Sequence, residues 1–241
     1  MSIITDRYGK RAPENADGNL RSLCLLKTER HPWAPFIPAG AKVLMLGSFP
    51  PKENRWSMNF FYPNFNNDMW RIIGLVFFGD RDHFISMPEK KFNKDMITDF
   101  CRKYGLALYD TAYEVRRLKD NASDKFLEIV TAADIPAMLH DMPRCNAIIT
   151  TGEKASETVA AQFGCPVPKT GEHIGLTLPA ASYPLSWTPL PIGGSAADDI
   201  YADRHIEFYR LPSSSRAYPL SLERKAEAYS ILTTLLEGDR P

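Results

Sequence analysis

The chain has 241 residues, 44% of them hydrophobic, and carries 29 basic and 29 acidic side chains. That length fits one α/β domain better than two small ones. The balanced charge does not indicate a polyanionic partner, although a local basic face can still bind one. No apolar stretch approaches the roughly 18 residues that a membrane span requires, so we expect no membrane partner.

The sequence lacks the motifs of several common chemistries. Its four cysteines form no C-x-x-C pair and its five histidines show no metal-ligand spacing, so we predict no metal site and no disulfide framework. The glycine-rich phosphate loops and the G-x-S-x-G elbow are also absent. These absences disfavour a metal hydrolase and an acyl-transfer hydrolase.

The start of the chain, MSIITDRYGKRAPENADGN (residues 1–19), is polar and charged and contains no apolar core of a signal peptide. We interpret residues 1–33 as a mobile extension of a cytoplasmic protein, and residues 34–241 as the folded domain. The first strand is predicted at residues 43–46 (VLML), a wholly apolar run typical of a strand covered on both faces in a parallel sheet. The strand stops at Gly47.

Helices and strands alternate after this point. Helical spacing predicts a helix over residues 68–78, whose first turn begins near Asn66, Asn67 and Asp68. A second helix is predicted to end at Gly105, before a strand at residues 106–109. The later elements are two helical pieces over residues 124–142 broken before Pro136, a strand at 146–150, and a helix at 153–164.

Residues 179–203 are rich in Pro and Gly and are predicted to form a long surface loop. Residues 206–211 alternate as a last strand, and residues 221–238 form a closing helix with Ser221 as its N-cap. This order predicts a single α/β domain with a doubly wound, mostly parallel, four-stranded sheet flanked by helices.

In a parallel sheet the carboxyl ends of the strands meet along one edge, where ligands bind. The four predicted strands lead into Gly47-Ser48-Phe49-Pro50, Asp110-Thr111, Thr150-Thr151-Gly152 and Pro212-Ser213-Ser214. Polar groups, an aromatic ring and two loops stiffened by proline would therefore gather around one crevice. This reasoning predicts a site without naming a substrate.

Three motifs together resemble the uracil-DNA glycosylase superfamily, and within it the branch with hypoxanthine- and mismatch-type DNA glycosylases. They are a strand ending in GSFP, an Asn shortly before a Trp (Asn67-Asp68-Met69-Trp70), and a late strand ending in LPSSS before a helix. The likeness runs in order from about Pro38 to Leu236. It implies a monofunctional DNA glycosylase of base excision repair that removes a flipped uracil or hypoxanthine from DNA without a cofactor. Nothing in the sequence indicates more than a monomer.

The resemblance assigns roles by position. It implies a water-positioning role for Asn67, with Asp68 and Asn66 as rivals, and a base-reading role for Asp110. The base pocket would be lined by Gly47, Ser48, Phe49 and Pro50, with Phe49 stacked on the base. The DNA backbone would be held by Pro212, Ser213, Ser214, Ser215 and Arg216.

Each role has a structural alternative. Asn67 or Asp68 could cap a helix, Asp110 could be a turn residue, Phe49 could belong to the core, and the serine loop could be a plain turn. The first motif lacks the Asp of the best-known uracil-DNA glycosylases, Leu211 stands where they carry a His, and their wedge Leu is missing. These departures favour a second hypothesis, a noncatalytic nucleic-acid or nucleobase-binding protein of the same fold.

Overall fold

The computed structural model describes residues 27–87, 89–118, 126–180 and 203–238. Its strands are β1 (Thr28–Arg30), β2 (Val43–Gly47), β3 (Ile85–Ser86), β4 (Lys91–Phe92), β5 (Leu106–Asp110), β6 (Ala112–Arg117), β7 (Leu127–Ala132), β8 (Ala147–Thr151), β9 (His173–Leu178) and β10 (Arg204–Leu211). Its helices are the 3-10 turn η1 (Glu53–Arg55) and α2 (Met69–Phe78), α3 (Lys94–Tyr104), α4 (Ile135–His140), α5 (Glu153–Phe163), α6 (Leu222–Tyr229) and α7 (Ile231–Glu237).

A five-stranded sheet in the order β5-β2-β8-β10-β9 forms the centre of the molecule. The first four of these strands run parallel, and β9 pairs antiparallel with β10. The four predicted strands are confirmed, but the predicted number of strands is one too low. Sequence reasoning missed β9 because it is a partly exposed edge strand with a Gly in its middle, and so lacks the continuous apolar run of a central strand.

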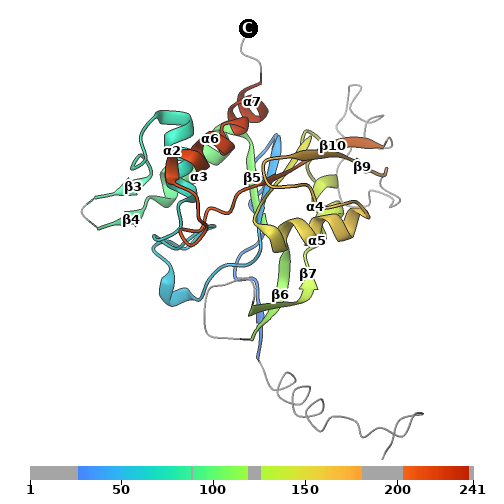
Figure 1. Cartoon of the computed structure of the whole chain (residues 1–241), viewed down its shortest axis with the longest axis horizontal. Helices are drawn as coiled ribbons and strands as arrows, with labels where there is room; N and C mark the ends of the chain where they lie inside the picture. Colours follow the sequence, from blue (N-terminus) through green and yellow to red (C-terminus); the bar gives the residue numbers. More distant parts are fainter. Residues whose placement is uncertain (1–26, 88, 119–125, 181–202, 239–241) are drawn as a thin grey trace, which may run out of the picture.

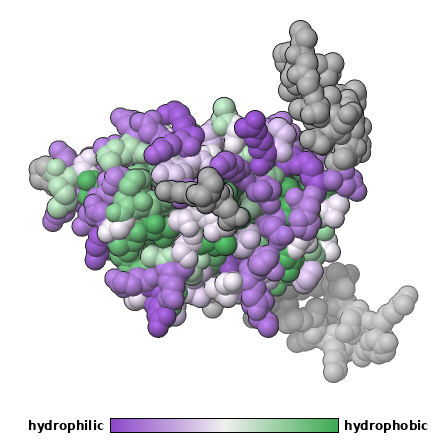
Figure 2. All heavy atoms as spheres, turned by 90° about the horizontal axis from the view of Figure 1, so that it is seen from above, coloured by the Kyte–Doolittle hydropathy of each residue, from purple (hydrophilic) through white to green (hydrophobic). Residues whose placement is uncertain are grey.

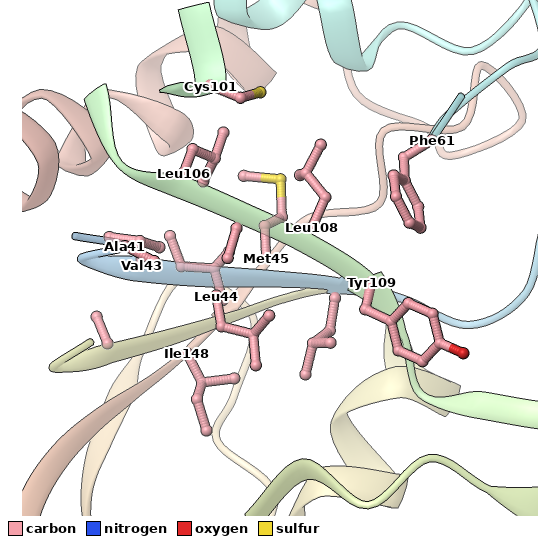
Figure 3. Close-up of a cluster of buried hydrophobic side chains, with 14 of the residues drawn as sticks. Ala41, Val43, Leu44, Met45, Phe61, Cys101, Leu106, Leu108, Tyr109 and Ile148 are labelled. Atoms are coloured by element: carbon pink, nitrogen blue, oxygen red, sulfur yellow. The ribbon is translucent and has the colours of Figure 1, made fainter. Parts of the chain in front are cut away.

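The central strand β2 is covered on both faces, as its apolar sequence predicts. All five of its residues are buried. Met45 lies on one face with Leu106 and Leu108 of β5, whereas Leu44 lies on the other face with Ile148 of β8 (Figure 3). Burial of each such side chain contributes about 1.5 to 3 kcal/mol. The packing makes the strand a rigid base for the residues at its carboxyl end.

Helices lie on both sides of this sheet. Helices α2, α3 and α6 gather on one side, and α4 and α5 lie on the other (Figure 1). The helix predicted over residues 68–78 is confirmed as α2, and the one predicted to end at Gly105 is confirmed as α3. Asn93 caps α3 by accepting the amide hydrogen of Met96, and Gly105 ends it in a left-handed conformation. None of the helices in the described ranges is long and apolar enough to cross a membrane.

Two helix predictions need correction. The first of the two pieces expected over residues 124–142 is wrong, because residues 127–132 form strand β7, which pairs with β6. Its β-branched run Ile129, Val130 and Thr131 favours a strand, and a partner strand lies beside it. The closing helix is confirmed with Ser221 as its N-cap, but it divides at Ser230 into α6 and α7.

The folded part begins earlier than the sequence indicates. Most of the expected extension at residues 1–33 lies outside the described residues, as does most of the expected loop at 179–203. Residues 28–30, however, form β1, which pairs with β6 and builds a small three-stranded sheet with β7. Two residues that follow β1, His31 and Trp33, pack against the strand-end edge of the main sheet and belong to the domain.

Candidate functional site

The carboxyl ends of the four parallel strands meet along one edge, as expected. Gly47 at the end of β2 is aligned with Asp110 at the end of β5, and Leu211 at the end of β10 is aligned with Thr151 at the end of β8. The order along the edge is therefore Asp110, Gly47, Thr151 and Leu211. Two of the sequence-predicted groups, the GSFP turn and Asp110, lie side by side at one end of it.

Gly47 allows the Asp110 carboxylate to approach the backbone of β2. A Cβ atom placed on Gly47 would collide with Oδ1 of Asp110, and it would lie 3.6 Å from the Tyr62 hydroxyl. That hydroxyl is 3.1 Å from Oγ1 of Thr151 at the end of the neighbouring strand. Carboxylate and hydroxyl oxygens thus converge over a glycine, an arrangement that suits polar contact with a ligand.

Tyr62 adopts an unusual backbone conformation. Its φ of 53° lies in the left-handed region, which is an outlier for a bulky residue. The bond to Thr151 and an edge-to-face contact with Trp70, 6.3 Å between ring centroids, hold it there. Strain of this kind concentrates at functional sites. Tyr62 leads directly into the loop that carries Asn67.

Asp110 is paired with a histidine that the sequence did not single out. Nε2 of His31 lies 3.0 Å from Oδ2 of Asp110. The imidazole lies between aromatic rings, with Tyr109 at 4.6 Å, Phe49 at 5.5 Å and Phe61 at 5.9 Å between centroids. The rings of Phe61 and Tyr109 lie near the end of β5 (Figure 3). Burial raises the pKa of Tyr109, and the nearby Asp110 carboxylate raises this pKa further, so the Tyr109 hydroxyl stays protonated.

Phe49 lies between the main sheet and the small sheet. It packs against a cluster made of Ala112, Val115, Leu127 and Ile129, and its ring lies 5.5 Å below the guanidinium of Arg117. Arg117 also donates to the carbonyl oxygen of Pro50 at 2.7 Å. Phe49 is nevertheless only half-buried. The side chain therefore has the packing of a core aromatic while part of it remains accessible.

Asn67 lies beside the loop that follows β10. It forms an isolated antiparallel bridge with Ser215, and the amide of the next residue, Asp68, donates to the carbonyl oxygen of Ser214 at 2.9 Å. Oδ1 of Asn67 accepts the amide hydrogen of Met69 at 2.8 Å in an Asx turn just before α2, whose N-cap is Asp68, a residue that makes no side-chain cap bond. The Asn67 carbonyl oxygen accepts a bond from Arg71 at 3.2 Å, which helps to fix the loop.

Both carboxylate oxygens of Asp68 are bound to cations. Nε of Arg216 lies 2.9 Å from Oδ1, and Nζ of Lys225 lies 3.1 Å from Oδ2. The Lys225 ammonium group also donates to the carbonyl oxygen of Ser215 at 2.8 Å. This ion cluster joins the start of α2, the loop after β10 and helix α6. Asp68 is therefore placed to hold two loops together.

The loop from Pro212 to Arg216 is ordered by local bonds. The Ser213 hydroxyl oxygen accepts from the amide of Ser215, and that of Ser215 accepts from the amide of Ala217, both at 3.2 Å. Ser214 is buried, whereas Ser213 and Ser215 are half-buried and Arg216 is exposed. Pro212 is anchored through its carbonyl oxygen, which accepts from the buried Tyr229 hydroxyl at 2.8 Å.

Two hollows of about 370 Å³ lie away from this edge. One is lined mainly by residues of α3, among them Phe100 and Tyr104, together with Phe78 of α2 and Phe84 of the segment that follows it. The other lies at the opposite ends of the strands, around residues 37–41 and 141–144. Figure 2, viewed from above, shows hydrophobic areas bordered by hydrophilic residues. Within the described ranges, no group of three or more His, Cys, Asp or Glu side chains could hold a metal ion.

Three residues of the site were not predicted from the sequence. His31 lies in the segment expected to be an extension, although the aromatic residues around it, HPWAPF, are atypical of a polar tail. Tyr62 gave no signal beyond its aromatic neighbours. The sequence did carry a signal for Lys225, because this residue shares helical spacing with Leu222 and Tyr229 on the packed face of α6. A lysine in such a stripe requires a partner, and Asp68 is that partner.

No protein-family model and no curated protein matches this chain. Its fold is similar to the solution NMR structure of a "putative uracil DNA glycosylase" from Methanosarcina acetivorans, with a TM-score of 0.51 and 17% sequence identity. The match covers 87% of this chain and 99% of that one. At this identity the similarity shows the fold alone, and the chain has the mixed α/β fold of that protein.

Proposed function

We propose that this chain is a DNA glycosylase that hydrolyses the N-glycosidic bond of a flipped, deaminated base. The observation that carries the proposal is the bridge between Asn67 and Ser215. It joins the residue that would position the water to the loop that would hold the DNA strand. The fold shared with the Methanosarcina protein supports the same reaction class.

In this proposal the base enters beside Gly47 and Asp110. A base within a duplex is inaccessible, so it must be extruded at a cost of a few kcal/mol, which is lowest for mismatched bases such as uracil or hypoxanthine. Phe49 would stack on the extruded ring, and such stacking returns about 1 to 3 kcal/mol. Backbone groups of Ser48 and Phe49, together with the Asp110 carboxylate, would contact the edge of the base.

Asn67 would hold the attacking water. Its Oδ1 already accepts the Met69 amide hydrogen, and a carbonyl oxygen has a second lone pair that can accept from water. Asp68 would act indirectly, because both of its oxygens are bound to Arg216 and Lys225. Bond cleavage places positive charge on the sugar and negative charge on the departing base, so a positioned water and preorganised donors are the groups this reaction requires.

The loop after β10 would contact the DNA backbone. The Ser213 and Ser215 side chains accept bonds through their oxygens, which leaves each hydroxyl hydrogen for a phosphate oxygen. Arg216 is exposed and its guanidinium has further N–H groups beyond the one bound to Asp68. Because these contacts carry no base information, the choice among deaminated bases would rest on the pocket at Gly47 and Asp110. Uracil and hypoxanthine are the substrates that we propose, as in the hypoxanthine- and mismatch-type branch.

A second candidate function is binding of a nucleic acid or nucleobase without catalysis. Two observations favour this noncatalytic function. Both oxygens of Asp68 are bound to cations, and the residue at the end of β10 is the apolar Leu211. Neither residue offers a free general base or an acid for the departing base.

Base excision from labelled oligonucleotides separates the two functions. Uracil and hypoxanthine are placed in single and double strands, and abasic sites are revealed by alkali. Cleavage by the wild-type chain that is lost in Asn67→Ala supports the glycosylase. DNA binding without cleavage of any substrate contradicts it and supports the noncatalytic protein.

A further inference from the structure

We propose that His31 is a positioning residue that fixes Asp110 as a single hydrogen-bond acceptor for the ring N–H of a deaminated base. This inference rests on the proposed function and deepens it, because it names the group that separates a deaminated base from its parent.

The geometry makes His31 a support for Asp110. Besides the bond from Nε2 to Asp110, Nδ1 of His31 lies 2.8 Å from the carbonyl oxygen of Trp33 and 3.2 Å from its amide nitrogen. Both nitrogens of the imidazole are therefore engaged, and the surrounding rings of Phe49, Phe61 and Tyr109 restrict its orientation. Because a carboxylate oxygen accepts and does not donate, the contact with Asp110 uses a hydrogen on Nε2, and the enclosed ring holds that hydrogen in place.

Exposure separates the roles of the two side chains. The His31 side chain is 0% exposed, whereas that of Asp110 keeps 11% of its surface accessible. A ligand at the strand-end edge can therefore reach Asp110 and cannot reach His31. Any effect of His31 on a ligand must pass through Asp110.

The pairing leaves one acceptor oxygen for the ligand. Oδ2 of Asp110 is bound to His31, and Oδ1 lies against the backbone of Gly47, in the place that a Cβ atom would fill, with the Tyr62 hydroxyl close to the same place. A carboxylate oxygen accepts hydrogen bonds and donates none. The remaining oxygen therefore matches a group that carries a hydrogen.

Deamination creates such a group. The ring nitrogen N3 carries a hydrogen in uracil and a lone pair in cytosine, and N1 carries a hydrogen in hypoxanthine and a lone pair in adenine. A single fixed acceptor attracts the first member of each pair and repels the second. A carboxylate released from His31 could turn its second oxygen to the exocyclic amino group of cytosine or adenine, so loss of His31 should relax the preference.

A double-mutant cycle tests whether His31 acts through Asp110. The excision rate of uracil from saturating DNA is measured in a single turnover for wild type, His31→Leu, His31→Gln and Asp110→Asn. His31→Leu should lower the rate about tenfold, and His31→Gln, whose amide N–H can also donate, should restore most of it. In the Asp110→Asn background, His31→Leu should cause no further loss.

The control is Val159→Ala, which removes buried methyl groups from α5. It should lower stability without changing the rate or the preference between uracil and cytosine. The proposal is overturned when His31→Leu and His31→Gln lower the rate equally, or when His31→Leu has the same effect with and without the Asp110 carboxylate.

A binding measurement tests the role of His31 independently of glycosylase activity. Trp33 lies 5.8 Å from the His31 ring, so the tryptophan fluorescence of the intact chain can report free bases that bind beside it. If no oligonucleotide is cleaved, the proposed function fails. Tighter binding of uracil than of cytosine that His31→Leu abolishes would then still support the positioning role. The same preference in wild type and His31→Leu would refute it.

Discussion

Nζ of Lys225 lies 3.1 Å from Oδ2 of Asp68, and both side chains are buried. The two residues are 157 positions apart in the chain, and the pair ties the start of α2 to α6. Helices α2 and α6 also pack side by side on one side of the sheet (Figure 1). Together with the Asn67–Ser215 bridge, this pair helps to fix Asn67 beside the loop at Pro212 to Arg216.

Replacing Lys225 should destabilise the chain strongly. Lys225→Met leaves the Asp68 carboxylate buried with one fewer partner, and breaking a buried pair of this kind costs about 3 to 5 kcal/mol. The free energy of unfolding is measured by urea titration. The double variant Asp68→Asn, Lys225→Met should recover part of the loss, because the uncompensated charge is removed with it.

The neighbouring Arg224 provides the control. It forms an exposed pair with Glu227 on the same helix, so Arg224→Met should change the free energy of unfolding by less than about 1 kcal/mol. Equal losses for Lys225→Met and Arg224→Met would show that burial of the pair is not what stabilises this region.

A methyl group at position 47 should displace Asp110. In Gly47→Ala the new Cβ atom collides with Oδ1 of Asp110, so the carboxylate must leave His31 or the strand must shift. Such overpacking costs about 1 to 3 kcal/mol. We expect a lower excision rate and a lower free energy of unfolding. In an Asp110→Ala background the same substitution should be tolerated, and strictly additive losses would argue against the collision.

Asn67 and Asn93 form a matched pair of side chains that accept from a helix amide. Oδ1 of Asn67 binds the Met69 amide at the start of α2, and Oδ1 of Asn93 binds the Met96 amide at the start of α3. Asn93→Ala removes an N-cap and Asn67→Ala removes the bond of a turn before the N-cap Asp68, so each variant should lose about 1 kcal/mol of stability. Only Asn67→Ala should also lower the excision rate, by about 100-fold or more. Equal rates for the two variants would assign Asn67 to capping alone.

The chain should lose stability in alkaline solution. Burial raises the pKa of the Cys145 thiol from its ordinary 9.0 to about 11, and it raises the pKa values of Cys101 and Tyr229 as well. Above about pH 9 the unfolded chain releases protons that the folded chain keeps. The free energy of unfolding therefore falls as the pH rises.

Denaturant titrations at increasing pH check this expectation. Cys145→Ala should reduce the fall of the free energy of unfolding with pH more than Cys165→Ala does, since Cys165 is only half-buried. A free energy of unfolding that stays constant above about pH 9 would show that these groups do not remain protonated in the folded chain.

The sequence predicted the features that depend on local patterns. The apolar run at Val43 to Leu46 indicated a central strand, and Gly105 stands where α3 ends. The strand β7 was mistaken for a helix because its identity depends on β6, a partner that no local pattern reveals. The pairings of His31 with Asp110 and of Lys225 with Asp68 join residues far apart in the chain, so only the fold could show them.

The order of strands in the sheet has a consequence for folding. Strand β2 lies between β5 and β8, although it is the first of the five to be synthesised. This apolar strand can pair only after β5 and β8 have been synthesised. Parallel pairing of this kind is slow because segments that are distant in the chain must meet first. During that time the unpaired strand is exposed to association with other chains. We expect refolding from denaturant to be slow, and its yield to fall as protein concentration rises.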